Sequence, residues 1–166
     1  MRYLAIDLGD KRTGLALGDD VTGIASPAGL VEIPIDRARG DALLDALAAR
    51  ARADLGPADA LVLGMPLNMD GSEGPRAKLV RAFALRLAAL AARPVILADE
   101  RKTSQAADAR MAQSGLTHGQ KKARRDAIAA AEILRALLED PAARIDTIEP
   151  PTTPPEGAQS GANPPG

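Results

Sequence analysis

The apolar positions of the chain fall into two patterns, short continuous runs and stripes at helical spacing. The runs predict five strands, over residues 3–7, 13–18, 29–35, 60–64 and 94–100. The stripes predict helices over about 41–55, 76–92, 104–114 and 120–139. The first three strands follow one another without a helix, which predicts an antiparallel meander, whereas helices separate the later strands and predict parallel pairing. We therefore expect an α/β fold with a mixed five-stranded sheet flanked by helices.

The chain changes in composition near residue 141. Its 166 residues suit a single domain, and residues 1–140 contain every predicted strand and helix. The end of the chain, "EPPTTPPEGAQSGANPPG", is rich in Pro, Gly, Ser and Thr and has no apolar periodicity. We predict that residues 141–166 form a disordered tail.

The composition narrows the class of protein. There is no Cys, so neither a disulfide framework nor a Cys-based zinc site is available. With no Trp, one Tyr and one Phe, platforms of stacked aromatic residues for nucleic-acid bases are nearly excluded. The start "MRYLAIDLGD" does not resemble a signal peptide, and no apolar run approaches the length of a membrane span. We expect a cytoplasmic protein without a membrane partner.

The net charge is −1, so binding to nucleic acid would require a local basic patch. Residues 101–125 provide one, because they contain seven basic residues against the single acidic Asp108. The seven are Arg101, Lys102, Arg110, Lys121, Lys122, Arg124 and Arg125.

Carboxylates follow two of the apolar strands and begin one apolar helix face. Asp7 ends the first strand, and Asp99 and Glu100 end the last, pointing to opposite faces if that strand continues through them. Asp126 begins the helical stripe of Ala130, Ile133, Leu134 and Leu137, which places it at the start of a buried face. A carboxylate there needs a cation, either a basic side chain (Lys11, Arg12 or Lys122) or a metal ion. Three such carboxylates suit one or two divalent metal ions that hydrolyse a phosphodiester.

Four segments together resemble the YqgF family, also called RuvX, of RNase H-like proteins. They are "AIDLGDKRTGLAL", "LVLGMPLNMDGSEGP", "DERKTSQAA" and "RRDAIAAAEILRALL", in the order expected of that family. The resemblance implies an RNase H-like fold and a site of Asp7, Glu100 and Asp126 that binds Mg²⁺ or Mn²⁺, and it selects Glu100 over Asp99. It also implies a nuclease. We favour processing of the 5′ end of pre-16S rRNA, with ribosomal particles as partners, over resolution of Holliday junctions in branched DNA.

Further residues are candidates for contacts with the nucleic-acid substrate. In the long loop 64–75, polar side chains follow a strand end, where α/β proteins bind ligands. With the basic residues near the carboxylates, the candidates are Lys11, Arg12, Asn68, Asp70, Arg101, Lys121, Lys122 and Arg125. The single histidine, His118, is predicted to be a solvated loop residue, with proton transfer near the carboxylates as the alternative.

The sequence departs from the family pattern at three positions and leaves two other classes of function open. Met65 stands where Leu is usual, Lys102 where an apolar residue is usual, and Asp10 where Thr or Ser is more typical. The first motif also resembles the phosphate loop of two-domain ATPases, but the chain has room for only one such domain. A non-catalytic binding factor in ribosome assembly is the other alternative. The protein is expected to be a monomer, or a homodimer if it resolves junctions.

Overall fold

A computed structural model describes residues 1–102 and 118–152 of the chain. In it a mixed sheet has the strand order β3-β2-β1-β4-β5-β6. The strands are β1 (Arg2–Leu8), β2 (Thr13–Asp19), β3 (Ala25–Val31), β4 (Ala60–Met65), β5 (Val95–Asp99) and β6 (Arg144–Ile148). β1, β2 and β3 are antiparallel, β4 and β5 run parallel to β1, and β6 returns antiparallel to β5. The predicted α/β fold with a mixed sheet flanked by helices is confirmed, with six strands instead of five.

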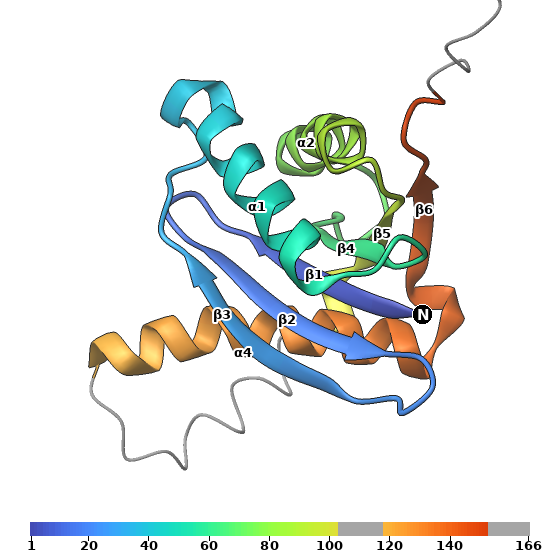
Figure 1. The fold of residues 1–166 in the computed structure, drawn as a ribbon. Coiled ribbons are helices and arrows are strands. Elements are labelled where there is room, and N and C mark those ends of the chain that lie inside the picture. The colour runs from blue at the N-terminus through green and yellow to red at the C-terminus, as the bar shows by residue number, and fades with distance from the viewer. Residues whose placement is uncertain (103–117, 153–166) are drawn as a thin grey trace, which may run out of the picture.

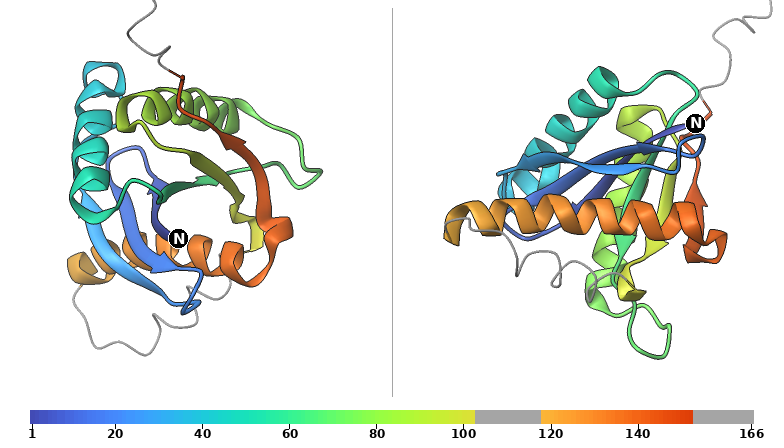
Figure 2. Two further views of the ribbon diagram at one scale, coloured as in Figure 1. Left: turned by 45° about the vertical axis from the view of Figure 1, so that its right-hand side comes forward. Right: turned by 90° about the horizontal axis from the view of Figure 1, so that it is seen from below.

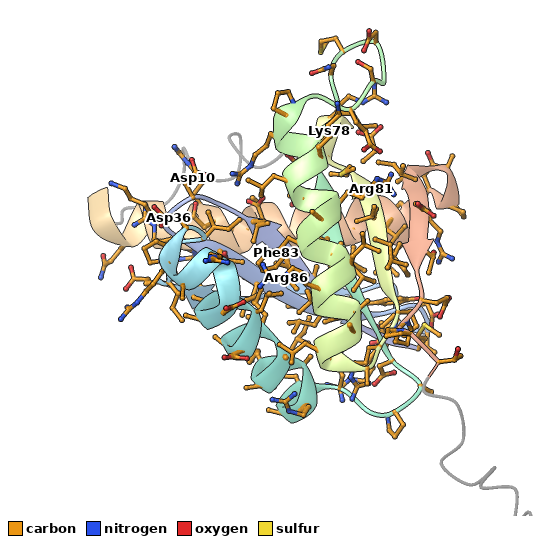
Figure 3. All side chains as sticks on the ribbon, turned by 90° about the horizontal axis from the view of Figure 1, so that it is seen from above. Asp10, Asp36, Lys78, Arg81, Phe83 and Arg86 are labelled. Atoms are coloured by element: carbon orange, nitrogen blue, oxygen red, sulfur yellow. The ribbon has the colours of Figure 1, made fainter. Side chains whose placement is uncertain are left out.

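Helices cover both faces of the sheet (Figure 1). They are α1 (Asp41–Asp54), α2 (Pro75–Ala91) and α4 (His118–Glu139), with short 3-10 turns η1 (Arg37–Gly40), η2 (Glu100–Lys102) and η3 (Pro141–Ala143). α1 and α2 lie on one face, and α4 crosses the other face (Figure 2). Figure 3 looks down on the layer of α1 and α2, where Phe83 and Arg86 lie between the two helices.

β1 is one of the two central strands and is buried from both sides. Its residues alternate between the two cores: Leu4 and Ile6 pack with α1 and α2, while Tyr3 and Ala5 pack with α4. A strand covered on both faces has no polar side to show in its pattern, which is why its sequence is a continuous apolar run. The same alternation places Asp7, the next odd-numbered residue, on the face covered by α4.

β6 lies within residues 141–166, the range that the sequence assigned to a tail. Exposed Arg144 and Asp146 alternate with half-buried Ile145 and Thr147, and Ile148 at the end of the strand is buried. Arg81 in α2 donates to Asp146 at 2.7 Å. Five residues at a sheet edge between prolines give only a weak periodic signal. Residues 153–166 of the predicted tail, and the predicted helix 104–114, lie outside the described residues.

β3 covers residues 25–31, not the predicted 29–35. Pro27 falls inside the strand, which is acceptable because β3 is an edge strand with one side unpaired. The pairing shifts between Leu15 and Ala16 of β2, opposite a bulge that includes Gly29 at φ 108°. The proline and the bulge obscured the strand in the sequence.

Candidate active site

Asp7 and Asp126 are brought close together by a glycine of β2, the strand that pairs with β1 and packs against α4. Asp7 in β1 is paired with Gly14 in β2, and a Cβ on Gly14 would lie 1.9 Å from the carbonyl oxygen of Asp126. The main chain of α4 can therefore rest on β2 only because residue 14 has no side chain. This close approach places the start of the buried face of α4 beside the end of β1.

Glu100 reaches the same side of the sheet over a second glycine. A Cβ on Gly64 would lie 2.7 Å from Oε2 of Glu100 and 2.6 Å from Cδ1 of Ile133 in α4. Gly64 follows Leu63, which is paired with Ile6, the residue before Asp7. The carboxylates of Asp7, Glu100 and Asp126 therefore lie where the carboxyl ends of β1 and β5 meet the start of the buried face of α4. We call this place the acidic edge.

The environment of this edge disfavours negative charge. Burial raises the pKa of Asp7 to about 6, and the charge of Asp126 adds to the effect. Burial raises the pKa of Glu100 to about 7, with a further contribution from the charge of Asp7. Among the described residues, no three acidic or histidine side chains already stand close enough to enclose a metal ion. The three carboxylates are neighbours without being gathered at one point.

Arg12 provides one counter-charge. Its Nε lies 3.2 Å from Oδ2 of Asp126, so the structure contains the ion pair that the sequence offered as one alternative. Arg12, Lys11 and Asp126 also line a surface hollow of about 430 Å³. Lys11 and Arg12, the two basic residues of the first motif that are candidates for contact with nucleic acid, therefore lie beside the acidic edge.

Arg76 provides another counter-charge and was missed by the sequence reasoning. It is the second residue of α2, and its guanidinium donates to the carbonyl oxygen of Leu8 and to Oδ1 of Asp10, both at 2.5 Å. Its charge lowers the pKa values of Asp7 and Glu100 against the larger effects that raise them. The signal available in the sequence was a cation in the first turn of a helix, where the helix dipole disfavours it and a partner is needed.

A family model, described as "RuvX: Holliday junction resolvase", matches residues 1–140. The chain belongs to the RuvX family. A relative from Anaeromyxobacter sp. (strain Fw109-5), named "Putative pre-16S rRNA nuclease", is 45% identical over 140 residues, covering 84% of this chain and 97% of the relative. One of the same name from Geobacillus kaustophilus (strain HTA426) is 38% identical, covering 84% and 98%. RuvC of T. thermophilus, solved with a Holliday junction substrate, is 14% identical with a TM-score of 0.48, covering 84% and 94%.

In this RuvX chain the polar residues of the loop after β4 bond to the loop itself. Asn68 Nδ2 donates to Ser72 Oγ at 2.9 Å, and Asp70 Oδ1 accepts from the amide and hydroxyl of Ser72 at 2.9 and 2.6 Å. These hydrogen bonds lower the pKa of Asp70. Asn68 and Asp70 therefore shape the loop, and their contact with the substrate stays a prediction.

Arg101 holds the same loop against the end of β5. Its guanidinium binds both carboxylate oxygens of Asp99, and Nη1 donates to the carbonyl oxygens of Asn68 and Met69 at 3.3 Å. Asp99 is thus occupied by Arg101, while Glu100 lies over Gly64. The two carboxylates take different partners, as expected if only one belongs to the acidic edge.

The remaining candidates of the RuvX chain are on α4. Arg125 is exposed there, next to Asp126. Lys121 and Lys122 belong to the helix, and their side chains lie outside the described residues. His118, predicted to lie in a loop, is instead the first residue of α4. None of the helices in the described ranges is long and apolar enough to cross a membrane.

Proposed function

We propose that this chain is a metal-dependent nuclease that hydrolyses phosphodiester bonds at Asp7, Glu100 and Asp126. The proposal is carried by the neighbouring positions of these three carboxylates, which come from β1, the end of β5 and α4. They can lie this near to one another because Gly14 and Gly64 have no side chains. The nuclease domain is the matched range 1–140, to which β6 adds an edge strand.

The chemistry of the site suits Mg²⁺ or Mn²⁺. Carboxylate oxygens are the donors that these ions prefer, and a divalent cation would relieve the burial and repulsion that raise the pKa values of Asp7 and Glu100. When bound, such an ion supplies an activated water and stabilises the leaving oxygen. Asp7, Glu100 and Asp126 would hold it, with the carboxylates drawing closer than they stand and Asp126 released from Arg12.

The substrate we propose is structured RNA, namely the 5′ end of pre-16S rRNA on ribosomal particles. The names of the relatives support this choice. Lys11, Arg12 and Arg125 lie beside the carboxylates and would contact the phosphate backbone, joined by Lys121 and Lys122 of α4. With so few aromatic residues in the chain, recognition would depend on backbone shape more than on stacked bases.

Resolution of Holliday junctions is the second candidate, favoured by the description of the family. It requires two copies of the chain, so that two sites face paired strands. A non-catalytic assembly factor would bind the same RNA without cleaving it.

Incubating the purified chain with a pre-16S rRNA fragment and with a four-way DNA junction in Mn²⁺ tests these proposals. We expect cleavage of the RNA, abolished in Asp7→Asn, Glu100→Gln and Asp126→Asn and retained in the control Asp45→Asn, an exposed carboxylate on α1. Cleavage of the junction alone would reverse the choice of substrate. Binding without cleavage of either would support the assembly factor and reject the nuclease.

A further inference from the structure

Arg76 completes the hydrogen bonding of β1 beyond the point where β4 ends its pairing. The paired residues of these two strands end at Ile6 and Leu63. Past that point Nη2 of Arg76 donates to the carbonyl oxygen of Leu8, the residue that follows Asp7. A main-chain carbonyl in a partly buried position needs such a partner, and here a side chain takes the place of a neighbouring strand.

The same guanidinium also holds the turn between β1 and β2. Its Nη1 donates to Oδ1 of Asp10 at 2.5 Å. Asp10 is 80% exposed, so the ion pair itself contributes little to the free energy of unfolding. Its effect is geometric, because one planar group joins the start of α2 to two points of the turn.

We propose that Arg76 is a positioning residue of the acidic site. It fixes the β1–β2 turn, and with it the Asp7 carboxylate, through a clamp that consists of Asp10, Arg76 and the Leu8 carbonyl group. The catalytic consequence rests on the nuclease function proposed above. The Asp10 carboxylate gives Arg76 a charged partner in this turn.

A direct phosphate contact by Arg76 is the competing role, and it predicts the opposite effect of removing Asp10. If Arg76 bound phosphate, the Asp10 carboxylate would compete with the substrate, and Asp10→Ala would lower KM. If Arg76 acts through the clamp, Asp10→Ala and Arg76→Ala impair the same step, and the double variant is no worse than Arg76→Ala.

The same helix offers a matched control. Arg86 donates to the carbonyl oxygen of Arg39 at 2.7 Å and to Asp41, so it also joins an aspartate and a main-chain carbonyl group. It lies ten residues further along α2, about 15 Å from Arg76 at the rise of an α-helix. Figure 3 shows Arg86 beside α1 and Asp10 beyond the end of the helical layer. Arg86→Ala removes an equivalent contact away from the acidic edge.

Hydrogen exchange of the full chain tests the clamp without any assay of cleavage. We expect the amides of residues 7–14 to exchange several-fold faster in Arg76→Ala and in Asp10→Ala, with the double variant no faster than Arg76→Ala. Arg86→Ala should leave this segment unchanged. Unchanged exchange in both single variants, or fully additive increases in the double variant, would overturn the proposal.

Kinetics in Mn²⁺ then separate positioning from binding. We expect Arg76→Ala to lower kcat about tenfold with little change in KM, since displaced catalytic groups reduce the rate of the chemical step. Arg76→Lys should recover part of kcat. A raised KM at unchanged kcat, with a lowered KM in Asp10→Ala, would replace the clamp by a phosphate contact. If the wild-type chain cleaves neither substrate, the nuclease proposal fails, and the exchange experiment still decides on the clamp.

Discussion

The carbonyl oxygen of Asp126 in α4 lies against Gly14 in β2, at a place where an added Cβ would be only 1.9 Å away. Gly14 is also the residue paired with Asp7. One position without a side chain thus sets both the approach of the helix to the sheet and the distance between two of the proposed catalytic carboxylates.

Gly14→Ala is expected to push α4 away from β2. The new methyl group meets main-chain atoms, which cannot move as a flexible side chain would, so we expect a loss of about 1–3 kcal/mol in the free energy of unfolding. Cleavage should fall more steeply than stability, because Asp126 moves with the helix. Chemical denaturation and the Mn²⁺ assay measure the two effects. The control is Gly119→Ala, since an added Cβ there meets nothing within 4 Å; equal behaviour of the two variants would contradict this account.

Much of this arrangement was predictable from local patterns, and its closest contacts were not. The apolar run that ends at Asp7 and the helical stripe that begins at Asp126 report burial on their own elements, so both carboxylates could be found in the sequence. The Gly14–Asp126 contact depends on the register of β1 with β2 and on the packing of α4, which no local pattern contains. Arg76 escaped for the same reason, because its partners are more than 60 residues away in the chain.

Stability should depend on pH through Asp7. Its pKa is about 6 in the folded chain, above the ordinary value of 3.8, because of burial first and the charge of Asp126 second. The folded state therefore holds this proton more tightly than the unfolded state. The associated stabilisation is present below about pH 4 and is lost as the pH rises towards 6.

Asp7→Asn removes this loss, so above pH 7 and in the presence of a chelator the variant should be more stable than the wild type, by on the order of 1–3 kcal/mol. Urea denaturation at pH 5 and pH 8 provides the measurement. Asp54→Asn, on the other face of the sheet, serves as the control. If the free energy of unfolding changed by the same amount in the wild type and in Asp7→Asn between pH 5 and pH 8, Asp7 would have no such effect.

A bound divalent metal ion should offset the loss of stability that ionised carboxylates cause at the acidic edge. A cation that binds only the folded chain raises its melting temperature according to its concentration relative to Kd. We expect millimolar Mn²⁺ at pH 8 to raise the melting temperature of the wild type by several degrees, and to have much less effect on Asp7→Asn and Glu100→Gln. Thermal scans with and without Mn²⁺ make the comparison. An equal rise in all three proteins would place the binding of the metal elsewhere.

Thr13 offers a test of stability that leaves the acidic edge intact. It begins β2 and is fully buried, and its hydroxyl oxygen has no hydrogen-bond partner among the described residues. It lies on the face of β2 that also carries Leu15, which packs with α1 and α2, opposite to the face of Gly14 and Asp126. Valine has nearly the same shape without the polar atom, so Thr13→Val should raise the free energy of unfolding by about 1 kcal/mol. Urea denaturation measures this gain, and a stability lowered by the substitution would mean that the hydroxyl group is satisfied in solution.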